Sequence, residues 1–377
     1  MNICIVSPSL GYGGSNIIAA TTLGKELNKN HNLVYYSYKY TDNYSNLPEE
    51  KIYFFKGRHS KLLDKFKKGI EYIFSGGKFT PYKYYKGEIK QLSELIETFN
   101  IDCIILNSFT AVSIFAIPLK KKYPKVKQIA WMHESAEQTF GSLVKNYLKS
   151  YEESLASVDR IVCLTQTDLK AYSKFNHNSV IIHNPVTFNT SVKSKLKERV
   201  ISFTSRLDVE IKGLDYLIEV AKTIPSTWKI RVAANGSKNQ VKKFLSLIKE
   251  NGVENVIEYV GALNGEALID HYVNSSIFIS TSRIESFQLV LIEAMECGLP
   301  VISFKHSGAK EILDNGRYGV LIENYKINKM SSEINKLCNS YEERLKWQNI
   351  SLKRVNDFNM DEIKVHWIQL LDNLGVK

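Results

Sequence analysis

Two glutamates separated by seven residues are the part of this sequence whose residue types and spacing could do chemistry most directly. Glu285 follows an apolar run typical of a buried strand, and Glu293 lies in a helical pattern that begins near Leu289. The intervening Ser286–Gln288 would place backbone N–H groups at the helix start, where an anion such as a diphosphate is stabilised. The Glu293 carboxylate could accept hydrogen bonds from a vicinal diol, and Glu285 would lie closer to the group attached to the diphosphate. Alternatively, both are ordinary surface carboxylates, because this spacing also occurs by chance.

Two cations, Arg206 and Lys212, follow a second apolar run, Val200–Thr204. We expect Arg206 at the end of a strand and Lys212 at the start of the helix Leu214–Thr223. Open α/β sheets bind ligands at the carboxyl ends of their strands, and two cations there could neutralise a diphosphate without a metal ion. The alternative is a pair of solvated charges beside a loop, which is the usual environment of Arg and Lys.

Positioning these side chains requires strands that alternate with helices. Short apolar runs predict strands at Asn2–Ser7, Ile101–Leu106, Gln128–Met132, Arg160–Leu164, Val180–His183, Val200–Thr204, Trp228–Ala233, Ile257–Val260, Ile277–Ser280 and Pro300–Phe304. Helical spacing of apolar residues separates most of these runs, which indicates βαβ units and parallel sheets. The sequence therefore predicts an α/β protein with two Rossmann-like halves.

Composition limits the class of protein. The chain has 377 residues, 44% of them hydrophobic and 24% charged, which suits two globular domains and excludes a disordered or collagen-like protein. The five cysteines are scattered without a C-x-x-C pair, so we expect neither a zinc ribbon nor a disulfide framework, and a reducing cytosol. No apolar run is long enough to span a bilayer, and the N-terminus lacks the pattern of a signal peptide. We therefore expect a soluble intracellular protein.

The basic residues are unevenly distributed. Lys and Arg number 50 against 39 Asp and Glu, for a net charge of +11, and the excess lies in the first half, especially between Lys56 and Lys90. This predicts an anionic partner. Within residues 59–90, apolar residues at helical spacing alternate with basic ones: Lys61, Leu62, Leu63, Lys65, Phe66, Lys67, Lys68, Ile70, Ile73 and Phe74. The pattern is typical of a helix on an anionic membrane surface, and equally of a helix that packs on the sheet.

Together, several motifs resemble a known family. They are Gly13-Gly14, His133-Glu134, Asn184-Pro185, Arg206-Leu207, Lys212-Gly213, Gly261, the Glu285 and Glu293 pair, Gly298-Leu299-Pro300, and Gly308 with Glu311. On these residues the sequence resembles the retaining glycosyltransferases of family 4, which have the GT-B fold. The resemblance implies two Rossmann-like domains facing across a cleft. An acceptor-binding domain would span 1–187 and a nucleotide-sugar-binding domain 188–355, with a helix at 356–377 crossing back to the first domain.

The resemblance also implies roles for individual residues. Arg206 and Lys212 would hold the donor diphosphate, Glu293 the ribose hydroxyls, and Glu285 the hydroxyls of the transferred sugar. His133 would lie near that sugar and count, with Glu285, Arg206 and Lys212, among the catalytic residues. The implied donor-binding set is Gly13, Gly14, Arg206, Lys212, Gly261, Glu285, Ser286, Phe287, Gln288, Leu289 and Glu293.

The implied activity is transfer of a hexose-type sugar, with retention, from a nucleotide diphosphate sugar, in particular a UDP-sugar. The acceptor would be a cell-surface glycan, a lipid-linked sugar or a teichoic-type polymer. Because the sequence has no Asp-x-Asp pair, neither a metal ion nor a cofactor is expected, the nucleotide sugar being a substrate. Gln288 departs from the glycine or proline common at this position, which affects the phosphate loop. We expect the protein in the cytoplasm, at the inner face of the cell membrane if the 59–90 segment binds lipid.

Several alternatives stay open. The chain could be a non-catalytic GT-B subunit that presents an acceptor to a partner glycosyltransferase. A nucleic-acid-binding role is not expected, because no recognition-helix or aromatic-basic RNA motif accompanies the positive charge. A group of tyrosines could stack on sugar rings or serve in core and surface packing: Tyr35, Tyr36, Tyr38, Tyr40, Tyr82, Tyr84 and Tyr85.

Overall fold

The computed structural model describes residues 1–10, 14–39, 47–55, 71, 78–323 and 325–375. It divides the chain into two compact units. The N-terminal unit contains Met1–Pro185 and Met360–Lys377, and the C-terminal unit contains Val186–Asn359. The divisions predicted from the sequence lie after residues 187 and 355. The apolar and basic residues between Lys61 and Phe74 that suggested a membrane-surface helix lie outside the described residues, as does Gly13.

The N-terminal unit is built on a parallel seven-stranded sheet with the strand order β3-β2-β1-β4-β5-β6-β7. Its strands are β1 (Asn2–Ser7), β2 (Asn32–Ser37), β3 (Ile52–Phe54), β4 (Cys103–Asn107), β5 (Lys127–Trp131), β6 (Arg160–Cys163) and β7 (Ser179–Ile181). Five of them correspond to predicted strands, and β2 and β3 were not predicted. The order reverses between β1 and β4, because β2 and β3 extend the sheet on one side of β1 and β4 to β7 extend it on the other.

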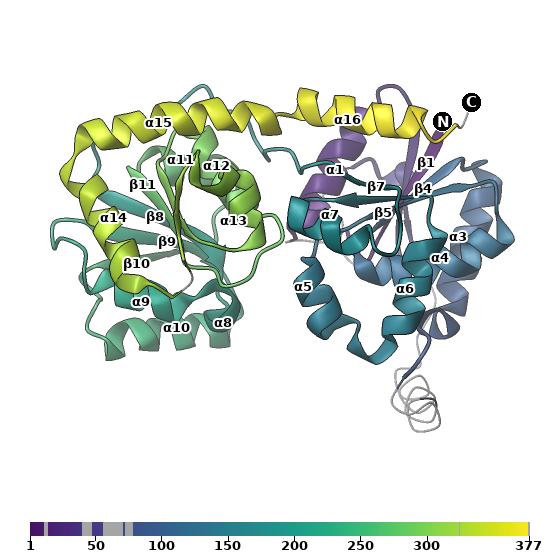
Figure 1. Ribbon diagram of the computed structural model, residues 1–377, viewed down its shortest axis with the longest axis horizontal. Coiled ribbons are helices and arrows are strands. Elements are labelled where there is room, and N and C mark those ends of the chain that lie inside the picture. Colours follow the sequence, from purple (N-terminus) through teal and green to yellow (C-terminus); the bar gives the residue numbers. More distant parts are fainter. Residues whose placement is uncertain (11–13, 40–46, 56–70, 72–77, 324, 376–377) are drawn as a thin grey trace. The chain divides into compact units, whose positions relative to one another are not determined.

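Helices cover both faces of this sheet (Figure 1). They are α1 (Ser15–Leu27), α3 (Lys86–Thr98), α4 (Phe109–Lys122), α5 (Ala136–Gln138), α6 (Leu148–Ser157), α7 (Gln166–Tyr172) and α16 (Met360–Asp372). Four short segments of other helical types also lie in the described part of this unit: η1 (Glu49–Lys51), η2 (Pro81–Tyr84), η3 (Thr139–Leu143) and η4 (Lys145–Tyr147). Burial on both faces explains why the strands are nearly continuous apolar runs instead of alternating ones.

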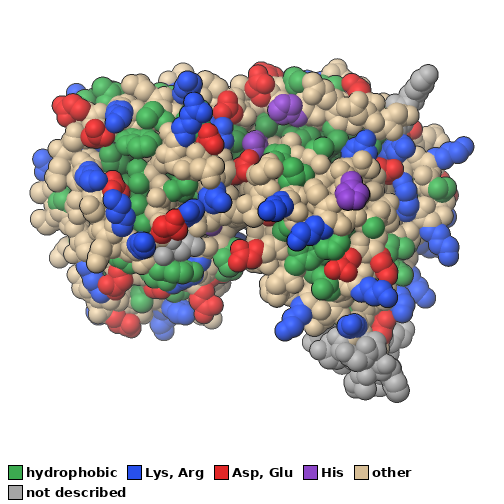
Figure 2. Space-filling view, viewed as in Figure 1, with side chains coloured by type: hydrophobic (Ala, Val, Ile, Leu, Met, Phe, Trp, Pro, Cys, Tyr) green, Lys and Arg blue, Asp and Glu red, His purple; other side chains and the backbone are tan. Residues whose placement is uncertain are grey.

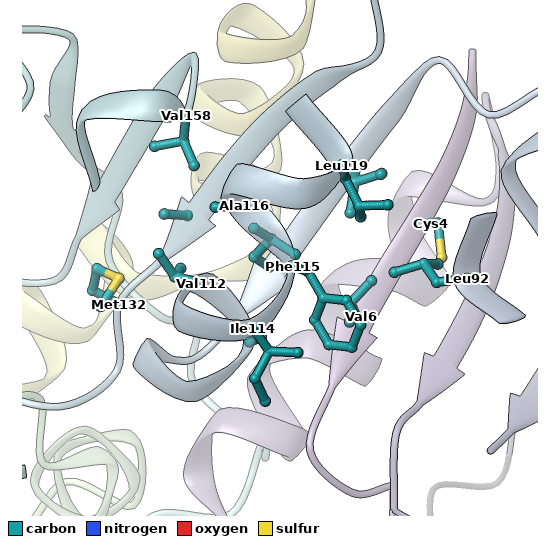
Figure 3. Packing of buried hydrophobic residues seen from close by; sticks show 14 of the residues in the cluster. Cys4, Val6, Leu92, Val112, Ile114, Phe115, Ala116, Leu119, Met132 and Val158 are labelled. Carbon is teal, nitrogen blue, oxygen red and sulfur yellow. The ribbon is translucent and has the colours of Figure 1, made fainter. Parts of the chain in front are cut away.

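The main core of the N-terminal unit lies between the sheet and the helices α3, α4 and α6. Figure 3 shows side chains of β1, α3 and α4 gathered in this cluster, including Cys4, Val6, Leu92, Phe115 and Leu119. On the opposite face, α16 packs beside α1, and its Trp367 ring meets the Trp131 ring of β5 at 4.8 Å between centroids. The last helix therefore returns to the N-terminal unit, as the resemblance implied.

The C-terminal unit has a parallel six-stranded sheet with the order β10-β9-β8-β11-β12-β13. Its strands are β8 (Val200–Arg206), β9 (Lys229–Asn235), β10 (Ile257–Gly261), β11 (Ile277–Ser280), β12 (Val301–Phe304) and β13 (Val320–Ile322). Its helices are α8 (Val209–Lys212), α9 (Leu214–Ala221), α10 (Lys238–Glu250), α11 (Gly265–Val273), α12 (Leu289–Glu296), α13 (Ser307–Ile312), α14 (Ile327–Asn339) and α15 (Tyr341–Val355). The predicted α/β class with two Rossmann-like units is confirmed, and only β13 of this sheet was not predicted.

All five cysteines are buried and free, which agrees with the absence of a disulfide framework. Among the helices of the described ranges, none combines the length and the apolar character that crossing a membrane would require. On the face shown in Figure 2, Lys and Arg side chains lie among Asp and Glu side chains on both units.

Candidate active site

The order of strands makes one edge of the C-terminal sheet the candidate ligand site. From β8 the chain extends the sheet through β9 to β10, and then returns to the other side of β8 to add β11, β12 and β13. In open α/β sheets, ligands bind at the carboxyl ends of the strands where the order reverses in this way. Arg206 ends β8, and Glu285 lies in the loop after β11, so predicted site residues flank the reversal on both sides.

Lys212 is held at this edge by a short helix and a glycine. The Asp208 side chain caps α8 by accepting a hydrogen bond from the Ile211 backbone N–H at 2.9 Å. Gly213 follows with φ +62°, and a Cβ there would lie 2.1 Å from the Thr281 carbonyl oxygen, so only glycine fits. Lys212 therefore ends α8 and does not begin the next helix, which corrects the sequence analysis. Its side chain is buried under the β11 loop instead of extending into solvent.

The Lys212 ammonium donates a hydrogen bond to the Glu285 carboxylate, and the two form an ion pair. Only 10% of the Lys212 side chain and 15% of the Glu285 side chain are exposed, so water screens this pair weakly. The Glu285 carbonyl accepts hydrogen bonds from the Ser307 hydroxyl at 2.8 Å and the Gly308 N–H at 3.2 Å. A Cβ at Gly308 would lie 2.5 Å from the Ser286 carbonyl oxygen, so glycine permits this contact between the β11 and β12 loops.

Arg206 is the more exposed of the two predicted cations. As the last residue of β8 it pairs in register with Asn235 of β9. Within the described ranges of the chain it makes no ion pair with an acidic side chain. Its guanidinium is therefore available to an anionic ligand, whereas Lys212 would share its ammonium between a ligand and Glu285.

Glu293 lies inside α12 with its carboxylate held by two hydroxyls. Thr187 donates to Oε1 at 2.7 Å and Tyr272 donates to Oε2 at 3.0 Å. The side chain is buried, and this burial raises the pKa of Glu293. Each carboxylate oxygen can accept more than one hydrogen bond, so the two hydroxyls orient the group without using all of its capacity. Sequence reasoning missed both hydroxyl residues, because nothing in the local pattern around them indicates a partner more than twenty residues away.

Gln288, the departure from the family pattern, is the centre of a buried polar network. Its amide nitrogen donates to the hydroxyls of Ser280 at 2.9 Å and Ser282 at 3.2 Å. His306 caps α13 by accepting from the Ala309 N–H at Nδ1, so its Nε2 carries the proton and donates to the Gln288 carbonyl oxygen at 3.2 Å. Burial lowers the pKa of His306 to about 4, which keeps the ring neutral near pH 7. Gln288 therefore fixes the loop before α12, a role that required the fold to identify.

The other predicted donor-binding residues differ in what they can offer. The side chains of Phe287 and Leu289 are buried, and the Phe287 ring packs edge-on against Phe358 with 5.8 Å between centroids. Only their backbone groups could serve a ligand. Gly261 ends β10 with φ +81°, two strands away from β8 on the sheet, or roughly 10 Å from Arg206 at ordinary strand spacing. The structure thus brings Lys212, Glu285 and the start of α12 together, and leaves Gly261 apart.

In the N-terminal unit, His133 follows β5 at the carboxyl edge of its sheet. Its Nε2 lies 2.5 Å from the Asn107 Oδ1, and its Nδ1 lies 3.5 Å from the Asn184 amide nitrogen. The ring also meets Trp131 at 4.6 Å between centroids. Burial lowers the pKa of His133 to about 3 and raises the pKa of the neighbouring Glu134 carboxyl. His133 is therefore neutral near pH 7 and suited to hydrogen bonding, not to carrying a positive charge.

Asn107 fixes which proton His133 carries. Its amide nitrogen donates to the Ser7 hydroxyl at 3.0 Å and the Asn16 carbonyl at 3.3 Å, so its Oδ1 faces His133 and accepts from Nε2–H. These bonds connect the ends of β1 and β4, where the strand order reverses. Gly14 precedes α1 here, and a Cβ on it would lie 2.3 Å from the Asn16 side-chain oxygen. Gly14, the described residue of the early glycine motif, thus lies two residues before Asn16, whose carbonyl bonds the same Asn107 side chain as His133.

In the part of the chain that the structure describes, no group of three or more His, Cys, Asp or Glu side chains is placed to hold a metal ion.

Known proteins resemble this chain in sequence and in fold. Residues 187–354 match the family model for glycosyl transferases group 1. An uncharacterized glycosyltransferase of Haemophilus influenzae is 29% identical over 77% of this chain and 81% of its own length. The amylovoran biosynthesis glycosyltransferase AmsD of Erwinia amylovora is 27% identical over 72% of this chain and 78% of its own.

Solved structures share the fold over the full chain. A sucrose-phosphate synthase of Thermosynechococcus elongatus superimposes with a TM-score of 0.79 at 16% identity, covering 99% of this chain and 98% of that one. HepE of Anabaena in complex with UDP gives a TM-score of 0.77 at 19% identity, covering 99% and 100%. The unit Val186–Asn359 therefore matches the glycosyl transferases group 1 family, and the chain as a whole has the GT-B fold of these glycosyltransferases.

Proposed function

We propose that this protein transfers a hexose-type sugar from a UDP-sugar to a cell-surface glycan, a lipid-linked sugar or a teichoic-type acceptor, with retention and without a metal ion. The observation that carries the proposal is the Lys212–Glu285 pair beside Arg206 at the strand-order reversal of the C-terminal sheet. It offers positive charge for a diphosphate and, next to it, a carboxylate for hydroxyl groups. Among the similar proteins, HepE was solved with UDP-glucose, and one relative is a poly(ribitol-phosphate) alpha-N-acetylglucosaminyltransferase of Staphylococcus aureus.

The proposed division of roles follows from hydrogen-bonding capacity. An ammonium has three donors, so Lys212 can bond a phosphate oxygen while it still holds Glu285. Arg206 can bind the same diphosphate with its planar fork of donors. The N-terminus of α12, which follows directly from the Glu285 loop, adds its dipole to this positive field. Together these groups would stabilise the negative charge that grows on the leaving diphosphate, which is the largest single contribution in many enzymes.

Glu285 and Glu293 would bind the two sugars of the donor. The ion pair fixes the Glu285 carboxylate, which can then accept hydrogen bonds from the hydroxyls of the transferred sugar. Glu293, oriented by Thr187 and Tyr272, would accept hydrogen bonds from the ribose. In this proposal His133 is a neutral hydrogen-bonding partner of the transferred sugar. The acceptor hydroxyl attacks the anomeric carbon on the face from which the diphosphate leaves, so no protein nucleophile is needed. The leaving phosphate takes the proton of that hydroxyl, so no protein base is needed.

The proposal is tested by incubating the wild-type protein with individual UDP-sugars and candidate acceptors, measuring UDP release, and determining the anomeric configuration of the product by NMR. We expect turnover with at least one UDP-hexose and a product of unchanged configuration. An inverted product would contradict retention. Tight UDP binding without transfer to any acceptor would instead favour the non-catalytic subunit.

We further propose that the protein works in the cytoplasm, at the inner face of the cell membrane, through the basic segment at 59–90. Each lysine near an anionic membrane contributes about 1 kcal/mol, so the Lys65, Lys67 and Lys68 charges should matter measurably. The wild type should sediment with anionic vesicles at low salt, and the triple substitution of these lysines by glutamate should not. If the wild type does not sediment with the vesicles, the membrane proposal is wrong and the alternative, a helix that packs on the sheet, is favoured.

A further inference from the structure

The N-terminal unit contains a pocket of about 130 Å³ that none of the proposed donor-binding residues lines. Tyr38, which follows β2, forms part of it, and so do Thr110 and Ser113 in the first turns of α4, which follows β4. Strand β1 lies between β2 and β4, so the pocket sits at the carboxyl edge of the sheet where the strand order reverses. This is the position at which open α/β sheets bind ligands.

Four aromatic rings from three segments of the chain line the pocket. Phe79 and Tyr147 meet at 5.2 Å between centroids with 52° between their planes, and Tyr38 and Tyr85 meet at 6.4 Å with 90°. The backbone hydrogen bond from the Phe79 N–H to the Asn146 carbonyl, at 3.2 Å, holds two of these segments together. The Tyr38 ring is buried, but the Phe79, Tyr85 and Tyr147 rings are each only partly buried. Aromatic surface therefore remains for a ligand.

Hydroxyl groups at the start of α4 supply the polar part of the pocket. The Tyr38 hydroxyl lies 2.6 Å from the Thr110 hydroxyl, which lies 2.9 Å from the Ser108 hydroxyl. Either atom of each pair can be the donor, so this chain can reverse and offer a ligand either a proton or a lone pair. Burial raises the pKa of Tyr147 to about 12, so its phenol also stays neutral. Among the described lining residues only the exposed Lys39 is charged.

We propose that this pocket binds one sugar ring of the acceptor. A pyranose has apolar C–H faces and a rim of hydroxyls, which matches aromatic walls joined to reversible neutral hydroxyls. The volume is below the several hundred Å³ of sites for larger ligands, so a whole nucleotide would not fit. The proposal rests on the proposed function, because it names part of the acceptor that the transfer reaction requires.

The position of the pocket determines which acceptor ring it would hold. Ser108 and Thr110 directly follow Asn107, whose side chain bonds His133. The pocket extends from β4 toward β2, whereas His133 follows β5 on the other side of β4. With about 4.8 Å between strands, the occupant lies roughly 5–15 Å from His133. It is therefore an acceptor ring beside the reacting sugar, and it would set acceptor specificity.

Ligand-observed NMR with methyl glycosides of glucose, galactose and N-acetylglucosamine tests the binding directly. At least one glycoside should bind the wild type, and Tyr85→Ala and Phe79→Ala should weaken that binding about fivefold or more. Thr110→Val keeps the side-chain volume but removes the hydroxyl, and it should also weaken glycoside binding. This variant keeps the test decisive if either larger truncation fails to fold. Tyr82→Ala is the matched control, because this half-buried tyrosine lies three residues from Tyr85 without lining the pocket.

The outcomes separate this inference from the proposed function. UDP affinity, measured by calorimetry, should be the same in all four variants, while the acceptor KM rises in the three pocket variants only. If no glycoside binds, if all variants bind like the wild type, or if decyl phosphate alone binds, the sugar assignment is wrong. Transfer with an unchanged acceptor KM in Tyr85→Ala would overturn the pocket and leave the proposed function standing. If the wild type binds a glycoside, the pocket variants do not, and no sugar transfer is found, the pocket stands and the proposed function is contradicted.

Discussion

Replacing Lys212 by methionine separates the structural role of this residue from its proposed catalytic role. The substitution keeps the apolar stem but leaves Glu285 without its partner, although only 15% of the Glu285 side chain is exposed. Removing one member of a largely buried ion pair costs about 3 kcal/mol. For a unit of this size that corresponds to a fall in Tm of roughly 6–12 °C. Lys222→Met, in a surface pair exposed by 39% and 51%, should change stability by less than about 1 kcal/mol.

Activity should respond differently from stability. Losing a cation that stabilises charge on the leaving diphosphate should lower kcat at least about 10²-fold, as losing one oxyanion-hole donor does. In the double variant Lys212→Met with Glu285→Gln, no charge stays buried and unpaired, so most of the Tm should return while kcat stays low. Differential scanning calorimetry and UDP-release kinetics on the four proteins give both readouts.

Two results would refute this reasoning. Turnover close to that of the wild type in a folded Lys212→Met protein would show that Lys212 does not stabilise the leaving group. A double variant as unstable as Lys212→Met would show that the buried pair is not the source of the stability loss.

The remaining predictions concern the donor, the metal and pH. Glu293→Ala should weaken UDP binding in calorimetry at least tenfold, whereas Glu285→Ala should leave it nearly unchanged, because UDP contains ribose but no transferred sugar. Equal losses of UDP affinity in the two variants would contradict the two assignments. Activity should survive excess EDTA, because Arg206 and Lys212 supply the charge, and complete loss restored by magnesium or manganese would contradict this. Burial lowers the pKa of His133 to about 3 in the folded protein, whereas in the unfolded chain the imidazole binds its proton from about pH 6.5 downward. The His133 contribution to stability is thus complete above pH 6.5 and is lost as pH falls toward 3, so His133→Gln should flatten the dependence of stability on pH in this window, as measured by urea unfolding.

Part of the fold follows from local sequence because buried parallel strands are continuous apolar runs. Asn2–Ser7, Ile277–Ser280 and most of the predicted strands appear as β1, β11 and their neighbours. The strands β3 and β13 have only three residues each, too few for a period to be recognised. The six residues of β2 include two adjacent tyrosines, which the sequence analysis considered only as individual aromatic residues.

For the candidate site, the sequence by itself determined which charged residues are concentrated after the strands. It did not determine that Lys212 and Glu285 form a pair, that Gln288 bonds His306, or that Thr187 and Tyr272 hold Glu293. Lys212 and Glu285 are 73 residues apart, and Thr187 and Glu293 are 106 apart. The Lys212–Glu285 and Gln288–His306 contacts exist only once the strand order has brought the loops after β8, β11 and β12 to one edge of the sheet, and Thr187 and Tyr272 reach Glu293 only once α11, α12 and the segment before β8 have packed together. Periodicity reports local geometry over a few residues, so only the tertiary structure could decide these partners.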